Sequence, residues 1–528
     1  MNLKKNGNSG LDKTKLVLVV LIIFALIQLF IQVSFLFQGT EFIASSLTID
    51  DTYYYLQTAW NLKNHGISSF DTINQTNGFQ LLWFLIVYLI SLVSSTKAVY
   101  LFVVLLVCFL FNTGVYYFIY RIGKISDLKH ISVLFGVLWF TRIISYHYYF
   151  SGMENSLHAF IIWWMIYEFL RVIQGKGKNE NPKLVLFSVL LVLNVWTRLD
   201  AGIFSALFYV TVLLVLLRRS ESIKALFAGF AKEIFKSILI IIGGGLLMLA
   251  AFCGFGGSLL PVSALIKTAG GSMFAIDNNF LNIFLERLSM SFSYSGLFPS
   301  LSILISVAGI IAILVVFRIT CKRYLKSMDI AWLLMLSGII IYHLYLAGSQ
   351  IGYHEYFFWY RTLFHIFSIM TTGMIFLFVG ELVSAFKREF IFSIVIYCFS
   401  LLLFLTSFNT LNKGLDHHPM LNAQYRTGIW IKENIPSDKI MASWNAGQIG
   451  FFSDRSVINL DGLINSYEYF KQISKKNFSL YKYLKKKGVD YIVDYCCIEK
   501  NGLIFLSKLV KRIETKKGWK PIQIRELL

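Results

Sequence analysis

Two adjacent carboxylates, Asp50 and Asp51, open a long polar interval near the start of the chain, residues 46–83, and a third, Asp71, follows within it. The interval lies between two apolar segments. An acid held on a short connection beside apolar helices can accept a proton from a hydroxyl group or ligate a divalent cation. The plain alternative is that Asp50 caps a helix and Asp51 complements the helix dipole. A capping acid is normally exposed to water, so the position beside apolar segments favours chemistry.

The residues that follow these acids have helical spacing. Between 51 and 64, Tyr55, Ala59 and Leu62 recur on one side of a helix. Gly66 stands where a glycine commonly ends a helix. The many aromatic residues suit a helix lying at the boundary between membrane and water. We therefore expect the two acids at the start of a short interfacial helix.

Composition indicates the environment of this helix. Hydrophobic residues make up 56% of the 528 residues and charged residues 15%, and the mean hydropathy is +0.63. The apolar residues occur in blocks of roughly 17–25, the length that crosses a bilayer. The net charge of +20 comes from Lys and Arg residues that punctuate these blocks, as the positive-inside rule expects, so we expect no nucleic-acid partner. Six cysteines, two of them adjacent, predict neither a disulfide framework nor a metal cluster.

The order of apolar and basic segments predicts an all-α bundle of about 11–12 transmembrane helices over residues 1–407. A first uncleaved helix, 16–37, puts the N-terminus in the cytoplasm and the loop 38–79 outside. Further apolar spans are expected at about 80–96, 99–118, 131–148, 155–172, 183–197, 200–217, 234–253, 300–318, 328–347, 361–381 and 389–407. Basic loops on the cytoplasmic side alternate with external loops that carry few basic residues only if 80–96 enters the membrane without crossing it. That leaves eleven crossings of the cell membrane.

Residues 408–528 are charged and free of apolar spans, and eleven crossings place them outside the membrane. A helix is expected at 421–434, a basic helix at 470–487 and a last helix at 502–516. Strands are expected at 439–444, 457–460, 489–493 and near 521–525. This alternation predicts a small extracytoplasmic α/β domain.

The motifs of the first loop, in their order, resemble those of the GT-C class of integral membrane glycosyltransferases. The resemblance is strongest to prokaryotic members whose loop ends T-N-G-[YF]-x-P-L-W. The matching residues are Asp50-Asp51, Ala59, Asn61, Gly66, Ser69-Phe70-Asp71, Thr76-Asn77-Gly78-Phe79 and Leu82-Trp83, with Leu81 in place of the expected proline. Further matches are the segments 151–155 (SGMEN), 197–200 (TRLD), 260–263 (LPVS) with Lys267, 446–452 and 459–463.

This resemblance implies an inverting enzyme that transfers a sugar from a polyprenyl-phosphate donor to an acceptor hydroxyl outside the membrane. The acceptor would be a protein or a polysaccharide, and membrane lipid would surround the donor. Asp50 would be the base, with Asp51 as the alternate, and Glu154 a second active-site carboxylate. The resemblance leaves open whether a divalent cation takes part, because some members bind one between loop acids and others do not.

Cations for the donor phosphate are expected near the outer surface, where an ionisable residue is costly and therefore a functional candidate. The candidates are Arg198, Lys267 and Arg361. The plain alternatives are that Arg198 pairs with Asp200 and that Arg361 is an interface anchor. Candidate substrate contacts are Tyr54, Asn77 and His354. Asp71 fits an Asx turn as well as a substrate ligand, and Asp461 is expected to be a turn residue.

Two other functions share parts of this pattern. A transporter or flippase of lipid-linked sugars would also be a helix bundle with basic loops, but it would often show two related halves, which are not visible in the sequence. A polymerase or ligase of lipid-linked sugars would be expected to place key arginines in a large late loop, whereas here the acid-rich loop comes first.

Overall fold

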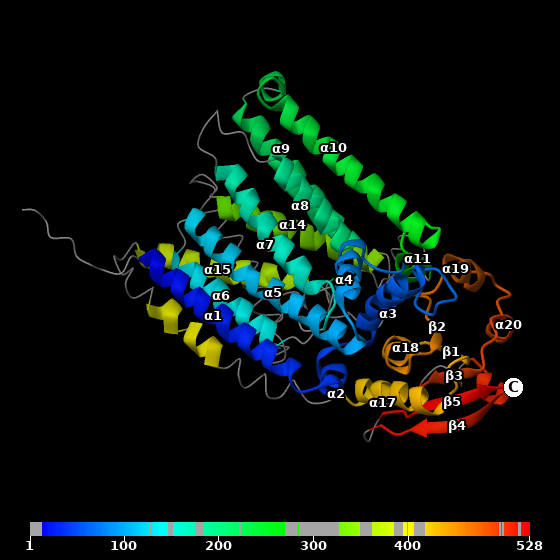
Figure 1. Ribbon diagram of the computed structural model, residues 1–528. Helices are drawn as coiled ribbons and strands as arrows, with labels where there is room; N and C mark the ends of the chain where they lie inside the picture. Colours follow the sequence, from blue (N-terminus) through cyan, green and yellow to red (C-terminus); the bar gives the residue numbers. More distant parts are fainter. Residues whose placement is uncertain are drawn as a thin grey trace, which may run out of the picture.

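The computed structural model describes residues 13–126, 129–145, 151–174, 184–220, 223–269, 327–348, 362–384, 394–398, 400–405, 418–495, 501–515 and 519–528, with the single residues 284 and 498. Within these ranges a bundle of long helices stands beside a smaller mixed domain (Figure 1). The helices of the bundle are α1 (Lys13–Leu36), α5 (Lys97–Ile125), α6 (Lys129–Ser145), α7 (Asn155–Gln174), α8 (Leu184–Thr197), α9 (Gly202–Arg219), α10 (Ile223–Gly256), α14 (Ser327–Gly348) and α15 (Thr362–Ser384).

Six of the helices in the described ranges are long and apolar enough to cross a membrane. They are Lys15–Leu36, Lys97–Ile125, Asn155–Gln174, Leu199–Arg218, Phe230–Gly256 and Met328–Tyr345. Exposed apolar side chains on the outside of the bundle, such as Phe30 on α1 and Leu246 on α10, suit contact with lipid. The protein is a multi-pass membrane protein. The span expected at 300–318 lies outside the described residues.

The first loop forms a layer of short helices between the bundle and the smaller domain. It contains α2 (Thr40–Phe42), a π-helical turn (Ile43–Leu47) and α3 (Asp50–His65). Gly66 ends α3 in the left-handed conformation, with φ of 72°, and its N–H donates to the Leu62 carbonyl at 3.0 Å. The helix and its terminal glycine are therefore as expected.

The next helix, α4 (Leu81–Val93), has 13 residues, so it is about 20 Å long. The hydrocarbon core of a bilayer is about 30 Å thick. Helix α8, with 14 residues, is about as short, and that residues 80–96 enter the membrane without crossing it stays a prediction.

The C-terminal domain contains one five-stranded sheet in the order β2-β1-β3-β5-β4. Its strands are β1 (Ile440–Ser443), β2 (Ser456–Asn459), β3 (Tyr491–Asp494), β4 (Ser507–Ile513) and β5 (Ile522–Leu527), and its helices are α17 (Pro419–Asn434), α18 (Gly447–Ser453), α19 (Tyr467–Ile473) and α20 (Leu480–Lys486). β1 pairs in parallel with β2 and β3, while β5 is antiparallel to β3 and β4. The expected mixed α/β domain is confirmed.

The two faces of this sheet belong to two hydrophobic cores. Met441 and Val457 lie in the core that continues into the helix bundle. Their neighbours Ala442 and Ile458 lie in a separate core with Tyr469 of α19 and Leu484 of α20. Because successive residues of a strand point to opposite faces, one face rests on the bundle side and α19 and α20 cover the other.

The helix expected at 502–516 is wrong. A short 3₁₀ turn at Leu503–Leu506 leads into β4, an edge strand that pairs with β5. Along β4 only Ser507 and Ile513 are buried, so the strand shows no apolar alternation, and its partner lies later in the chain. The basic helix expected at 470–487 is two helices, because Ser479 begins α20 and caps it by accepting from the Lys482 N–H at 3.5 Å.

Candidate active site

A cavity opens where the first loop, the bundle and the C-terminal domain meet. Its empty volume is about 500 Å³, including space open to solvent. It is lined by Asp51, Tyr54, Tyr55, Gly78, Phe79, Gln80, Met153, Glu154, Arg198, Ser263, Lys267 and Leu463. Five residues proposed from the sequence, Asp51, Tyr54, Glu154, Arg198 and Lys267, are therefore brought together here from distant parts of the chain.

Helix α3 places three of the lining side chains on one face. Asp51, Tyr54 and Tyr55 are separated by three and four positions, a spacing that puts residues on the same side of a helix. The preceding residue, Asp50, is turned by about 100° around the helix axis, since a helix has 3.6 residues per turn. Asp50 is not among the residues that line the cavity.

Asp50 instead binds the C-terminal domain. Its carboxylate accepts hydrogen bonds from the backbone N–H groups of Gly447 at 3.1 Å and Gln448 at 2.8 Å, at the start of α18. A Cβ on Gly447 would lie 2.1 Å from the Asp50 carbonyl oxygen, so this approach requires glycine. Burial raises the pKa of Asp50 to about 7, although the two N–H groups favour the charged form. Asp50 thus joins the first loop to the C-terminal domain.

Asp51 has a different environment. In the described part of the chain, no side chain or N–H group hydrogen-bonds to its carboxylate, which faces the cavity. Burial raises its pKa, and the negative charge of Glu154 acts in the same direction. The positive charge of Lys267 lowers the pKa of Asp51. A carboxylate whose pKa is raised, and whose oxygens face a cavity without a hydrogen-bond donor from the described residues, has the properties of a general base.

Arg198 is held by two carboxylates. Its Nη1 donates to Glu154 Oε1 at 2.9 Å, while its Nε and Nη2 donate to the two oxygens of Asp200 at 3.0 and 2.8 Å. The other oxygen of Glu154 accepts from the Tyr55 hydroxyl at 3.0 Å, and the Tyr342 hydroxyl donates to Asp200. The pairing of Arg198 with Asp200, one of the two interpretations left open by the sequence, is present. Two carboxylates therefore already neutralise the positive charge of Arg198.

Lys267 lies on α11 (Val262–Ala269), and Asn77 holds the start of that helix. The Asn77 side chain donates to the carbonyls of Phe252 and Ser258 at 3.0 and 2.9 Å, and its oxygen accepts from the Val262 N–H at 2.9 Å. Asn77 is fully buried, and these bonds use its amide group. Asn77 therefore positions the helix of Lys267. Because the amide group of Asn77 is used in these bonds, it is not free to make the substrate contact that the sequence predicted.

Asp461 reaches the same region from the C-terminal domain. Its Oδ2 accepts from the Tyr54 hydroxyl at 3.0 Å, and Asn459 donates to that hydroxyl at 3.2 Å. Its Oδ1 accepts from the Leu463 N–H at 2.8 Å, which is the turn role expected from the sequence. Burial raises the pKa of Asp461 to about 7, and the negative charge of Asp51 contributes to this shift. The contact with Tyr54, which crosses from one domain to the other, has no local signal in the sequence.

Asp71, another candidate, is not among the residues that line the cavity. Asp71 forms the Asx turn, with its Oδ1 accepting from the N–H groups of Ile73 and Asn74 at 2.9 and 2.7 Å, so it stabilises the loop. Arg361 and His354 lie outside the described residues. Across the described ranges, no group of three or more His, Cys, Asp or Glu residues is arranged to hold a metal ion.

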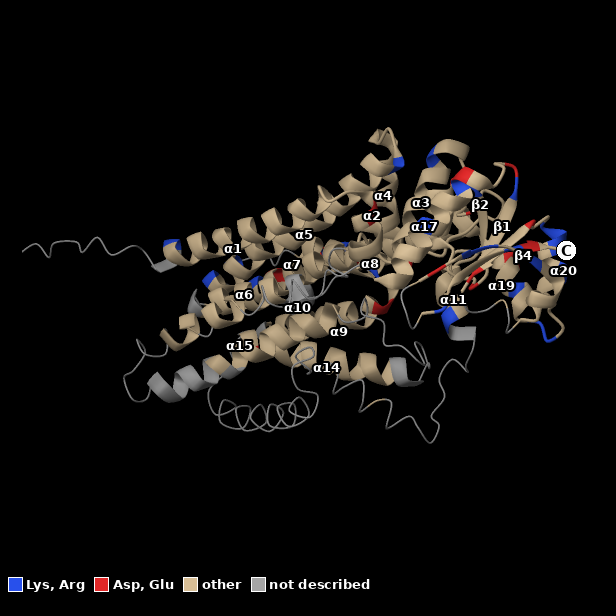
Figure 2. Ribbon diagram, turned by 90° about the horizontal axis from the view of Figure 1, so that it is seen from below, with Lys and Arg blue, Asp and Glu red and all other residues tan. Residues whose placement is uncertain are grey.

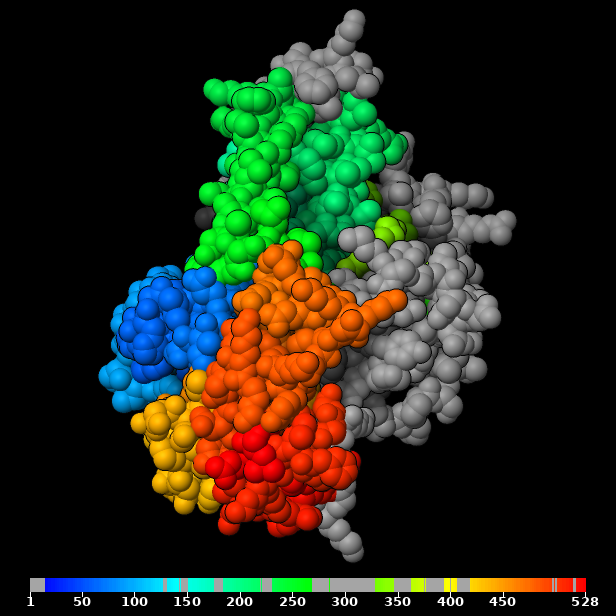
Figure 3. Space-filling view, turned by 90° about the vertical axis from the view of Figure 1, so that its right-hand side faces the viewer, coloured from blue at the N-terminus to red at the C-terminus, as the bar shows by residue number. Residues whose placement is uncertain are grey.

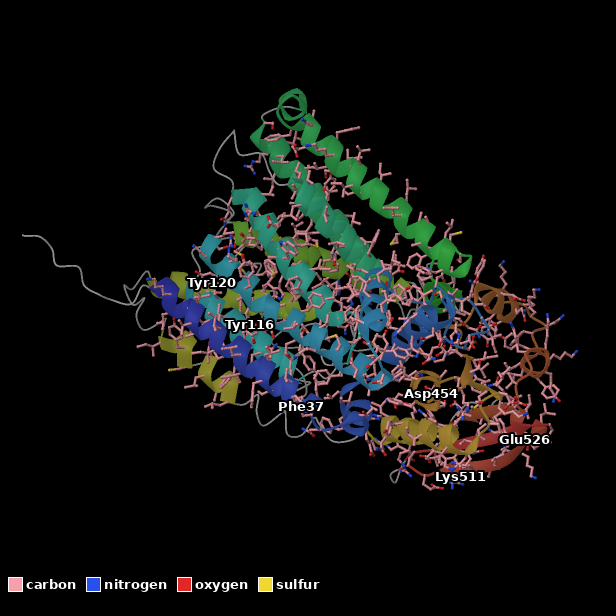
Figure 4. The ribbon with its side chains drawn as sticks, in the orientation of Figure 1. Phe37, Tyr116, Tyr120, Asp454, Lys511 and Glu526 are labelled. Atoms are coloured by element: carbon pink, nitrogen blue, oxygen red, sulfur yellow. The ribbon has the colours of Figure 1, made fainter. Side chains whose placement is uncertain are left out.

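Further contacts fix the C-terminal domain over the cavity. Lys97 on α5 forms an ion pair with Asp454 at 2.7 Å and donates to the Phe451 carbonyl, and Figure 4 shows Asp454 at this boundary. A Cβ on Gly78 would lie 1.9 Å from the carbonyl oxygen of Leu463, which lines the cavity. The cavity wall is therefore built jointly by loop, bundle and C-terminal domain.

Comparison with known proteins bears on this arrangement. Residues 418–526 match a family described as a domain of unknown function, DUF8728. A comparison with curated proteins gives no match. Among solved structures, the chain is similar to the apo oligosaccharyltransferase of Archaeoglobus fulgidus, with a TM-score of 0.56 and 14% identity over 92% of this chain and 70% of that one.

Two ligand-bound structures are similar as well. The archaeal oligosaccharyltransferase AglB from Archaeoglobus fulgidus, in complex with an inhibitory peptide and a dolichol-phosphate, gives a TM-score of 0.52 at 14% identity over 93% of this chain and 70% of that one. ArnT from Cupriavidus metallidurans, bound to undecaprenyl phosphate, gives a TM-score of 0.51 at 10% identity over 96% of this chain and 97% of that one. The chain has the fold of the GT-C class of membrane glycosyltransferases, which confirms the resemblance seen in the sequence at the level of the fold.

Proposed function

We propose that the protein is a glycosyltransferase that moves a sugar from a polyprenyl-phosphate donor to an acceptor hydroxyl on the outer side of the cell membrane. The observation that carries this proposal is the joint presence of the Asp51 carboxylate and the Lys267 ammonium group in one cavity at the bundle surface. The fold supports it, because solved proteins of similar fold bind dolichol-phosphate or undecaprenyl phosphate. With the N-terminus in the cytoplasm, the cavity and the C-terminal domain face outward.

The proposed reaction is a single displacement at the anomeric carbon. Asp51 removes the proton of the acceptor hydroxyl, and the acceptor oxygen forms a bond to the anomeric carbon. The bond from that carbon to the phosphate oxygen breaks, and polyprenyl phosphate leaves with the electron pair. Lys267 stabilises the negative charge of the leaving phosphate. Attack and departure on opposite sides invert the anomeric configuration.

The geometry favours Asp51 over Asp50 as the base, although the sequence alone placed Asp50 first. Both oxygens of Asp50 accept hydrogen bonds from α18, whereas the Asp51 carboxylate faces the cavity. A base must come within hydrogen-bonding distance of the proton that it removes. In this proposal Asp50 positions the C-terminal domain.

In this proposal Arg198 and Glu154 also take positioning roles. Arg198 is paired with Glu154 and Asp200, so its proposed role is to position Glu154 and the cavity wall rather than to bind phosphate alone. Glu154 in turn orients Tyr55. Arg361 and His354 stay predictions from the sequence as further donor contacts.

The test is a transfer assay on the purified protein in lipid nanodiscs with a panel of polyprenyl-phosphate sugars. We expect Asp51→Asn to lower transfer by about 10²–10⁴, the usual contribution of a general base, with folding checked by thermal unfolding. Asp50→Asn is the matched comparison: it keeps only one acceptor oxygen for the N–H groups of Gly447 and Gln448, so it should lower transfer through positioning, but less than Asp51→Asn does. Full transfer in Asp51→Asn would refute this base. Parallel assays with EDTA test whether transfer requires a divalent cation.

The assay also separates the alternative functions. Movement of the lipid-linked sugar across the bilayer without transfer, measured in reconstituted vesicles, would favour the transporter or flippase. Formation of long chains from the lipid-linked sugar would favour a polymerase or ligase.

A further inference from the structure

The outer helices of the C-terminal domain carry a dense group of lysines. Residues 467–489, which include α19 and α20, contain seven lysines and one acid, Glu468. Six of them are exposed and form what we call the lysine surface: Lys471, Lys475, Lys476, Lys482, Lys485 and Lys486. Figure 2 shows basic residues on α20 at the outer end of the domain.

Some lysines of the same domain have acidic partners, whereas those of the lysine surface have none among the described residues. Elsewhere, Lys432 pairs with Asp454 and Lys439 pairs with Asp490 at 3.0 Å. Within the described ranges, none of the six lysines of the surface forms an ion pair. On α20, Lys482 lies three and four positions before Lys485 and Lys486, a spacing at which like charges repel one another.

One helix of the lysine surface lies beside the helix that carries Lys267. The first helix of the surface, α19, packs against α11, which carries Lys267. Between the two, Gly462 approaches Ile266 so closely that an added Cβ would lie 2.7 Å from the Ile266 side chain, and the next residue, Leu463, lines the cavity. Figure 3 shows the orange surface of these segments directly bordering the green surface of α10 and α11.

Aromatic rings accompany the lysines. Tyr467 stacks on Phe470 with ring centroids 6.0 Å apart, and the Lys471 ammonium lies 4.2 Å from the centre of the Tyr467 ring. Tyr481 lies beside Lys485 in the same way on α20. Half-buried rings of this kind present apolar faces that can pack on the C–H groups of sugar rings. Cations interleaved with such faces fit a partner that carries both negative charges and sugar rings.

We propose that the lysine surface binds an anionic glycan polymer and directs it to the cavity as the acceptor of the transferred sugar. This step rests on the proposed function, because it names the class of acceptor for that reaction. A membrane surface is the other anionic partner to consider. α20 lies on the side of the domain away from the helix bundle, which favours a polymer approaching from outside (Figure 1).

The first test measures binding of the whole protein, in nanodiscs of phosphatidylcholine, to fluorescent carboxymethyl-dextran and to neutral dextran of the same length. The test variant is Lys475→Gln/Lys482→Gln/Lys486→Gln. The control variant, Lys508→Gln/Lys511→Gln/Lys520→Gln, removes the same charge from exposed lysines at and near β4, where Figure 4 labels Lys511.

We expect the wild type to bind only the anionic polymer. The dissociation constant should rise about tenfold or more in the test variant and less than twofold in the control. The slope of log K against log salt should also decrease by about 2 in the test variant, since each lost ionic contact with a linear polyanion, judged from nucleic acids, removes roughly 0.7–0.9. Equal weakening in both variants would refute the proposal. So would loss of binding to phosphatidylglycerol vesicles in the test variant with unchanged binding of the polymer.

A second measurement separates this proposal from the proposed function. With a donor that is turned over, the test variant should raise the KM for carboxymethyl-dextran as acceptor while slow hydrolysis of the donor by water is unchanged. Hydrolysis unchanged with an unchanged KM would refute the acceptor role of the lysine surface. Absence of any donor turnover in the wild type would refute the proposed function, and the binding test would still decide whether the surface holds an anionic glycan.

Discussion

Substitution of Gly78 by alanine tests how the cavity is assembled. The added Cβ would lie 1.9 Å from the Leu463 carbonyl oxygen and 3.2 Å from the Cα of Ile464. Ordinary van der Waals contact begins at about 3.4 Å, so the segment at Leu463 must retreat by about 1.5 Å. Both neighbours are backbone atoms of the C-terminal domain, which cannot move aside by rotating a side chain.

The retreat has two consequences. Overpacking of this kind usually costs about 1–3 kcal/mol of stability. Leu463 also lines the cavity, and Asp461 lies two residues before it, so the wall and the carboxylate bound to Tyr54 move together. Because a misplacement of about 1 Å can cost 10²-fold in rate, we expect Gly78→Ala to lower transfer by about that factor.

The assay compares transfer rates and thermal unfolding of Gly78→Ala with those of Gly245→Ala. Gly245 lies in α10, and a Cβ there would meet nothing within 4 Å, so the control should keep full transfer. Wild-type stability and transfer in Gly78→Ala would show that the C-terminal domain does not pack on the first loop as described. The reasoning about a shared cavity would then be refuted.

Three other perturbations follow from the site. Lys267→Met removes a charge that lowers the pKa of Asp51, so the rising limb of the pH–rate profile should move to higher pH; a limb that stays in place or moves to lower pH would show that the charge of Lys267 does not act on Asp51. Burial raises the pKa of Asp50 and of Asp461 from 3.8 to about 7, so the folded state keeps protons that the unfolded state releases, and stability should fall between about pH 4 and 7. In Asp50→Asn the thermal midpoint should fall less steeply over this pH range than in the wild type, because one of the buried acids of raised pKa is removed; an unchanged slope would show that the pKa of Asp50 is not raised in the folded state. Asn77→Ala leaves three or more backbone groups without their partner and should cost about 3 kcal/mol or more in thermal unfolding, with lower transfer; a stable variant would exclude the positioning role.

Much of the architecture could be predicted from local sequence. Apolar blocks of membrane length, basic residues between them and the loss of such blocks after about residue 407 indicate a bundle followed by a separate domain. Helix α3 and its terminal Gly66 follow from spacing and from the conformational freedom of glycine, both of which act within a few residues. The strand β4 could not be predicted, because β5, the one described strand that pairs with it, comes later in the chain and its own side chains are mostly exposed.

The site shows the same division. The sequence by itself determined that acids and cations would gather outside the bundle, since charged residues are costly within the hydrocarbon. Only the tertiary structure decided which of two adjacent acids faces the cavity, because one step along a helix turns a side chain by about 100° and the packing of α18 selects the direction for Asp50. Likewise, Arg198 meets Glu154, and Tyr54 meets Asp461, across separations that no local pattern encodes. Closing such long loops depends on the packing of whole helices and of the C-terminal domain, and that packing is a property of the complete fold.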